Sequence, residues 1–246
     1  MFPIRTSVPA RNPALVTWIL IAVNCAVFLF EIGLDPSDQE SFFIRYALIP
    51  ARYFAPEVHG LPAPSPVDYA PFFTNMFLHG GWLHLIVNMW TLWLFGPAVE
   101  DRLGSGRFLI FYLGCGMAAS AAHALANATS VVPALGASGA IAGVMGCYLR
   151  LFPYARVIVL VPIVFVPLFF ELHAVLYVGI WFVTQLLQGT AEIFSPAATG
   201  GVAWWAHVGG FIVGFVVGSI LRPTLQRTRP YYPDQGVYGF TPHGHR

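Results

Sequence analysis

The stretch PALGASGAIAGVMG, residues 133–146, decides the fold, because it places a serine between glycines at the start of an apolar segment. The stretch WWAHVGGFIVG, residues 204–214, places a single histidine inside another apolar segment. Polar side chains are costly in the hydrocarbon of a membrane, so each needs a reason to be there. If Ser138 and His207 lie at the same depth, the simplest reason is that they act on each other. This pairing predicts hydrolytic chemistry inside a membrane.

The composition favours a membrane protein and excludes several other classes. Hydrophobic residues make up 57% and charged residues 9% of the 246 residues, against roughly a quarter charged in soluble domains. The formal net charge is +1, and no basic patch interleaves with aromatic residues, so nucleic acid is not expected as a partner. Cys25, Cys115 and Cys147 lie in apolar stretches at spacings typical of neither disulfides nor metal sites, and are interpreted as packing residues.

Apolar runs predict six membrane-spanning helices. Residues 157–166 are also apolar, but Pro162 interrupts them, and they are expected to lie along the inner surface and merge into the fifth span. The prediction is an all-α polytopic membrane protein with a cytoplasmic segment at 1–13, a six-helix domain at 14–221 and a disordered cytoplasmic tail at 222–246. The predicted spans are 14–30, 77–99, 108–126, 138–151, a run from about 167 to 187, and 202–221.

The arginines predict the orientation in the membrane. All basic residues other than histidine are arginine, and only Arg45 and Arg52 fall in segments that are outside when the N-terminus is inside. Positive charge favours the cytoplasmic side, so both termini are expected there and the long connection 31–75 outside. Arginine without lysine also indicates a GC-rich bacterial genome, and hence a bacterial inner membrane. No internal repeat is evident, which disfavours a transporter built from two similar halves.

Four polar residues are predicted to share one layer near the outer side. Counting helical rise from the inner arginines and from Glu100 places Ser138, His207, His84 and Asn88 about 6 to 12 Å below the outer edge. Because Ser138 begins its helix below the surface, a cavity from outside has to reach it.

These residue types suit acyl transfer. A serine hydroxyl becomes a good nucleophile when a histidine removes its proton. The oxyanion that follows needs donors, and the backbone amide of Ser138 with His84 and Asn88, one turn apart, can supply them. Gly136 lets the backbone bend and substrate approach. No acidic residue is expected in this layer, so a Ser–His dyad is predicted.

Less specific interpretations stay open for each motif. The small residues of the serine and histidine segments are also typical of helix packing, and His207 alone is often only a structural hydrogen-bonding group. The second-span residues His79, His84 and Asn88 could be interfacial anchors or a metal site. Their shared depth favours catalysis, whereas a transporter or metal carrier would need membrane carboxylates, and Glu171 lies near the inner end.

The chain resembles the rhomboid family of intramembrane serine proteases over most of residues 14–221. The motifs that carry this resemblance are GASG at 136–139, AHVGG at 206–210 with Gly214, His79 with His84 and Asn88, EDRLG at 100–104, and Trp181 with Gln185.

The resemblance implies that Ser138 is the nucleophile and His207 the base. The Ser138 amide, His84 and Asn88 would form the oxyanion hole, His79 would order the outer rim, and Gly136, Gly139 and Gly210 would support the site. The family acts on transmembrane segments of other proteins near their outer ends, with no metal or organic cofactor. A catalytically silent rhomboid-like protein that binds membrane clients is the alternative. The substrate and the oligomeric state stay open.

Two positions differ from the family's pattern. Ala70 and Pro71 stand where many members have a Trp-Arg pair, and Ala142 stands where many have an aromatic residue that packs on the base. Trp204 and Trp205 are therefore candidates for holding the His207 ring.

Overall fold

The computed structural model describes residues 2–60, 64–163, 166–194 and 202–221, so the predicted tail at 222–246 lies outside the described residues. Within them, five helices are long and apolar enough to cross a membrane. The chain is therefore a multi-pass membrane protein. The five helices are α1 (Leu15–Ile32), α5 (Trp82–Leu103), α6 (Ser105–Ala126), α8 (Ala174–Phe194) and α9 (Trp204–Leu221).

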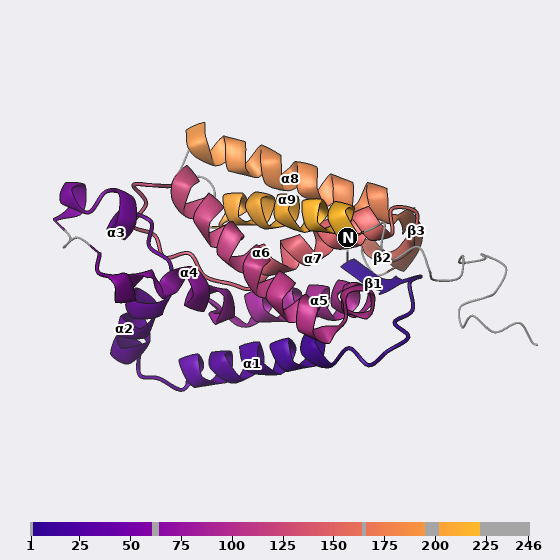
Figure 1. Ribbon diagram of the computed structural model, residues 1–246, viewed down its shortest axis with the longest axis horizontal. Coiled ribbons are helices and arrows are strands. Elements are labelled where there is room, and N and C mark those ends of the chain that lie inside the picture. The colour runs from indigo at the N-terminus through magenta and orange to yellow at the C-terminus, as the bar shows by residue number, and fades with distance from the viewer. Residues whose placement is uncertain (1, 61–63, 164–165, 195–201, 222–246) are drawn as a thin grey trace, which may run out of the picture.

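The remaining predicted span is the central helix α7 (Ser138–Leu151), which has the predicted bounds. It packs against α5, α6, α8 and α9 in the middle of the bundle (Figure 1). With 14 residues it is only about 21 Å long, less than the hydrocarbon thickness of about 30 Å. Five helices are long enough to span by themselves, and α7 is a shorter helix that they enclose, as expected of a segment that begins below the outer surface.

Helices α7 and α9 are in backbone contact. A Cβ atom added at Gly214 would lie 1.8 Å from the carbonyl oxygen of Gly143, and one added at Gly210 would lie 2.0 Å from the carbonyl oxygen of Gly139. Only glycine leaves room for such an approach, as in other close helix pairs in membranes. The glycines therefore fix the height of α7 against α9, and with it the relative position of Ser138 and His207.

A three-stranded antiparallel sheet, in the order β1-β2-β3, lies at the arginine-rich end of the helices (Figure 1). Its strands are β1 (Phe2–Thr6), β2 (Arg156–Ile163) and β3 (Val166–His173). The all-α prediction was wrong here, and the fifth span begins at Ala174 instead of about residue 167. An unbroken apolar run has no period that separates strand from helix. The β-branched residues from Val157 to Val159 favour the strand, and pairing satisfies their backbone groups.

The connection from α1 to α5 is built from short helices. Leu48 and Ala134 exchange two backbone hydrogen bonds of 3.0 and 2.8 Å, which tie this connection to the loop before α7. The short helices are α2 (Pro36–Tyr46), α3 (Ala51–Phe54), η1 (Glu57–His59), η2 (Pro66–Tyr69), α4 (Pro71–Thr74) and η3 (Asn75–Phe77).

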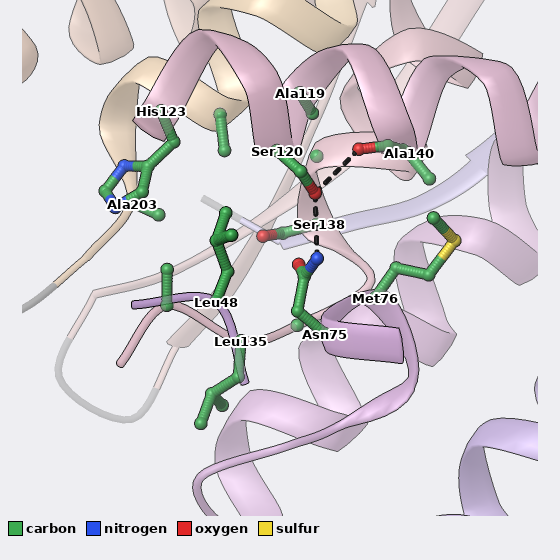
Figure 2. Close-up of a pocket in the computed structure, with 15 residues that line it drawn as sticks. Leu48, Asn75, Met76, Ala119, Ser120, His123, Leu135, Ser138, Ala140 and Ala203 are labelled. Atoms are coloured by element: carbon green, nitrogen blue, oxygen red, sulfur yellow. Dashed lines mark hydrogen bonds between the residues drawn. The ribbon is translucent and has the colours of Figure 1, made fainter. Parts of the chain in front are cut away.

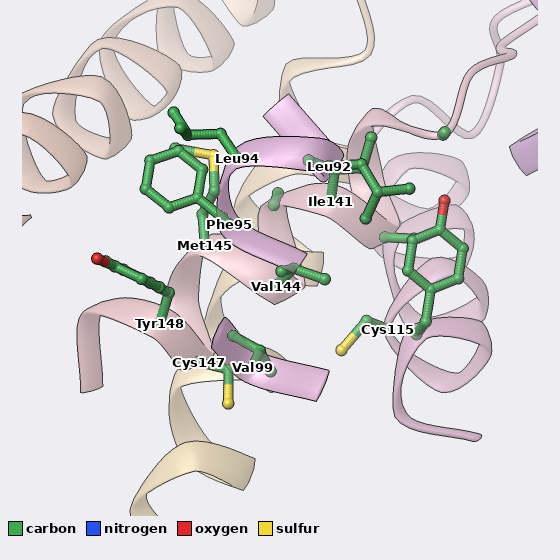
Figure 3. Packing of buried hydrophobic residues seen from close by; sticks show 14 of the residues in the cluster. Leu92, Leu94, Phe95, Val99, Cys115, Ile141, Val144, Met145, Cys147 and Tyr148 are labelled. Carbon is green, nitrogen blue, oxygen red and sulfur yellow. The ribbon is translucent and has the colours of Figure 1, made fainter. Parts of the chain in front are cut away.

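The buried core lies between α5, α6 and α7 (Figure 3). The rings of Phe95 and Tyr148 meet edge to face at 4.9 Å between centroids. Cys115 and Cys147 are buried and all three cysteines are free, which confirms their interpretation as packing residues. The core therefore packs α7 against α5 and α6.

The start of α1 is fixed by a carboxylate from α5. Glu100 is buried, and its oxygens accept hydrogen bonds from the backbone amides of Val16 (2.9 Å) and Thr17 (2.8 Å) and from the Thr17 hydroxyl (2.7 Å). Amides in the first turn of a helix lack partners within the helix, and a negative charge there is favourable. Glu100 therefore joins α1 to the bundle.

Candidate active site

Ser138 and His207 are in hydrogen-bonding contact. Ser138 is the first residue of α7 and His207 lies in the first turn of α9, so two helix N-termini bring the side chains together. The distance from Ser138 Oγ to His207 Nε2 is 2.8 Å. His207 is buried, with 8% of its surface exposed. The structure thus places side by side two residues that are 69 positions apart in the sequence.

Gln185 of α8 determines how His207 is protonated. Its Oε1 lies 2.7 Å from His207 Nδ1, and its Nε2 donates to the carbonyl oxygen of Trp181 at 3.1 Å. Because the amide oxygen only accepts, Nδ1 of His207 has to be the donor. In the neutral ring Nε2 is then the acceptor, and the Ser138 hydroxyl donates to it. This is the arrangement that a general base requires.

Two indole rings flank the His207 ring. The Trp181 ring lies 5.8 Å from it between centroids at 36°, and the Trp204 ring lies 6.1 Å away and perpendicular to it. Of the two tryptophans predicted to hold this ring, Trp204 contacts it. Trp205 lies near Gly189 instead. Together with Gln185, the two rings leave His207 little freedom to turn.

The loop before Ser138 needs glycine at position 136. Gly136 has φ of 126°, and a Cβ atom there would lie 2.7 Å from the ring of His84. Its backbone amide donates to the carbonyl oxygen of Asn75 at 2.9 Å. The positive φ favours glycine at this position, and the close contact places the His84 ring beside Gly136, two residues before Ser138.

Hydrogen-bond donors gather on the same side. The first amides of α7 have no intrahelical acceptor, because the first helical bond runs from Ile141 to Ala137. Asn88 is buried one turn after His84 on α5, and its Nδ2 has no hydrogen-bond partner among the described residues. Gly139 and Gly210 contribute the close α7–α9 contact described above. Ser138, Gly136 and the His84 ring therefore lie together at the start of α7, and Asn88 lies one turn further along α5.

A buried carboxylate, that of Glu31, contacts the backbone of His79. Glu31 is fully buried at the end of α1, and its Oε2 accepts a hydrogen bond of 3.3 Å from the backbone amide of His79. The His79 ring meets the His84 ring edge to face at 5.1 Å. Glu31 was expected in the outer connection, but it belongs to the end of α1. It bonds to the loop before α5, whereas His207 bonds to Gln185.

A small cavity of about 20 Å³, with mostly apolar walls, lies beside Ser138 (Figure 2). Asn75 Nδ2 donates to Ser120 Oγ at 2.8 Å on its wall, and His123 also lines it. This volume is enough for about one water molecule, for which Asn75, Ser120 and Ser138 offer polar groups. Asn75 and Ser120 were missed from the sequence; the only signal is that Ser120 and His123 are spaced to share one face of a helix.

Comparison with known proteins decides the family. The rhomboid domain model matches residues 67–224, more than half of the chain. The chain belongs to the rhomboid family. This confirms the resemblance inferred from the serine and histidine motifs.

Several curated relatives are rhomboid proteins by name. Rhomboid protein 1, mitochondrial, of Saccharomyces cerevisiae is 27% identical over 225 residues, 89% of this chain and 56% of the relative. Rhomboid protease GluP of Bacillus subtilis is 46% identical over 134 residues, 54% of this chain and 24% of the relative. The human presenilin-associated rhomboid-like protein, mitochondrial, is 31% identical over 152 residues, which are 61% of this chain and 35% of the relative. The matches thus span less than two thirds of each relative's own length.

Proposed function

We propose that this rhomboid protein is an intramembrane serine endopeptidase that cleaves transmembrane segments of other membrane proteins. The single observation that carries the proposal is the chain of hydrogen bonds from Gln185 through His207 to Ser138. It supplies a nucleophile and a base whose accepting nitrogen faces the hydroxyl. Family membership and the names of the relatives support the same reaction class.

The proposed reaction passes through an acyl-enzyme. Ser138 Oγ attacks the peptide carbonyl carbon while its proton passes to His207 Nε2. The resulting oxyanion is stabilised by the first amides of α7 with the side chains of His84 and Asn88. His207 then protonates the leaving amine, and the C–N bond breaks. A water molecule, deprotonated by His207, hydrolyses the ester and regenerates Ser138. The cavity beside Ser138 is a suitable place for that water.

The proposed setting is a membrane with the arginine-rich end of the helices on the cytoplasmic side. The protease domain then covers residues 14–221, and the site opens toward the outer side. The proposed substrates are transmembrane segments, so they reach the site from the bilayer, between the helices that enclose it.

Labelling with a fluorophosphonate probe tests the proposal. The purified protein in detergent is compared with Ser138→Ala and with Ser219→Ala, which removes a serine of α9 that bonds to Arg150 far from the site. We expect the wild type and Ser219→Ala to be labelled, and Ser138→Ala to lose the label.

Cleavage of a single-pass model substrate completes the test. Loss of cleavage in Ser138→Ala and in His207→Ala, with unchanged elution on size exclusion, supports the dyad. A wild-type protein that neither reacts with the probe nor cleaves, but binds the substrate, would instead indicate the catalytically silent alternative.

A further inference from the structure

The outward face of the sheet changes from charged to apolar along the strands. The β-strand register aligns Phe2, Leu160 and Phe169 in one row and Arg5, Ile158 and Glu171 in the next. Phe2 and Phe169 are exposed by 56% and 60%. In the second row, Glu171 also pairs with Arg156 at 2.7 Å. The apolar row is the one nearer the turn between β2 and β3.

The other face of the sheet is only partly covered by the protein. Val157 and Val159 of β2 are fully buried against the bundle, whereas Phe170 of β3, the partner of Val159, is 46% exposed. Leu168, next to Phe170 on this face, is 36% exposed. The hairpin formed by β2 and β3 therefore projects beyond the helices, with large apolar side chains on both faces of β3.

The lipid-facing side of α8 follows β3 along the chain, with the exposed Arg156–Glu171 ion pair between it and Phe169. The helix begins at Ala174, right after β3, and its exposed residues include Val175, Leu176 and Ile180. Because α8 is a candidate membrane span, β3, which joins it directly, lies at the membrane surface. Exposed apolar patches of this kind mark contact with a membrane or with a protein.

We infer that the β2–β3 hairpin, with Phe2 of β1, is a membrane-binding element that lies in the boundary between headgroups and acyl chains at the arginine-rich end. β3 is an edge strand, and no other described strand pairs with its free side. Open sheet edges are excluded from the hydrocarbon core but are tolerated where water and headgroups can bond to them. The Phe2–Leu160–Phe169 row reaches the acyl chains, and the Arg5–Glu171 row lies among the headgroups, where arginine attracts anionic lipid.

Site-directed fluorescence in proteoliposomes tests this placement. In a Cys25→Ala background, a polarity-sensitive dye is attached to Phe169→Cys, Phe2→Cys or Glu171→Cys; the remaining native cysteines are buried and are not expected to react. Ile180→Cys on α8 serves as the lipid reference and Asp38→Cys, exposed on α2, as the aqueous reference. Vesicles contain neutral and anionic phospholipids, some of them carrying a nitroxide quencher on the acyl chain.

We expect the dye at positions 2 and 169 to be blue-shifted, quenched by the nitroxide lipid as at position 180, and shielded from aqueous iodide. Position 171 should fall between the two references. Iodide quenching at positions 2 and 169 equal to that at position 38 would overturn the inference. Shielding from both quenchers would also overturn it, because it indicates a contact with another protein or a second copy. The two separate sites, each checked by size exclusion, guard against a misfolded variant.

Discussion

At the scale of single residues, Gln185 Oε1 is the acceptor, at 2.7 Å, for the Nδ1 proton of His207. Gln185→Leu would leave this donor buried and unpaired, at a cost of about 1–3 kcal/mol. We therefore expect the rate of fluorophosphonate labelling to fall by about 5- to 150-fold. Gln185→Glu keeps an acceptor and should label faster than the leucine variant. Equal labelling rates for the wild type and Gln185→Leu would show that Gln185 does not hold the ring.

His84 and Asn88 are expected to act in the transition state. Removing one oxyanion donor typically lowers kcat by about 10²–10³, and sharing with the α7 amides should make each single loss smaller here. His84→Ala and Asn88→Ala should therefore lower kcat on a model substrate with little change in KM. Leu83→Ala, on an exposed position of the same helix, is the control. A raised KM with unchanged kcat would indicate substrate positioning instead.

The site could be predicted from the sequence where a polar residue interrupts an apolar run. Ser138 and His207 are conspicuous for this reason, and helical rise gave them a common depth. Glu31 was missed because it lies one position beyond the predicted span of 14–30. Asn75 and Ser120 come from separate elements, and only the folded chain brings them together at 2.8 Å.

At the scale of elements, the α7–α9 contact tolerates no side chain. A Cβ atom at Gly214 would lie 1.8 Å from a backbone oxygen, whereas one at Gly179 of α8 meets nothing within 4 Å. Gly214→Ala should lower the free energy of unfolding by about 1–3 kcal/mol, measured by thermal or denaturant unfolding in detergent. Gly179→Ala should leave it unchanged or raise it by up to about 1 kcal/mol. Equal stability of the two variants would argue against the backbone contact.

Glu100 gives a second element-scale prediction. Glu100→Ala removes the acceptor for three hydrogen bonds at the start of α1, and each bond to a charged group is worth about 1.5–3 kcal/mol. We expect a large loss of stability and faster proteolysis near residue 15. Asp101→Ala removes an exposed pair of bonds to Asn12 and should have a small effect. Resistance of the Glu100 variant to limited proteolysis would contradict the capping role.

Element prediction succeeded for helices and failed for the sheet. The helix over 138–151 was predicted at its observed bounds, because glycines precede it and Arg150 and Pro153 mark its end. Residues 157–173 are apolar almost throughout, so they match a buried helix as well as a strand. The strands form because β2 pairs with β1, which lies more than 150 residues away in the sequence. No local pattern reveals such a pairing.

At the scale of the whole molecule, the site lies at the end of the bundle opposite the arginines. An intact substrate helix shields its peptide bonds, so cleavage needs an unwound segment near the outer end of the span. We expect cuts there, favoured by small residues at the cut and by helix-weakening residues just inside it, since each glycine lowers the unwinding cost by about 1 kcal/mol. Mass spectrometry of the products locates the cut. Cuts clustered at the cytoplasmic end would contradict the proposed orientation.

The direct contact of α7 and α9 backbones has a mechanical consequence. Most helix interfaces are layers of side chains, which change rotamers and yield when temperature or bilayer thickness changes. Between Gly139, Gly143, Gly210 and Gly214 there is no such layer, and so nothing in it to compress or rearrange. We therefore expect the helices that carry Ser138 and His207 to move as one stiff body, which insulates the spacing of their reacting atoms from deformation of the surrounding lipid.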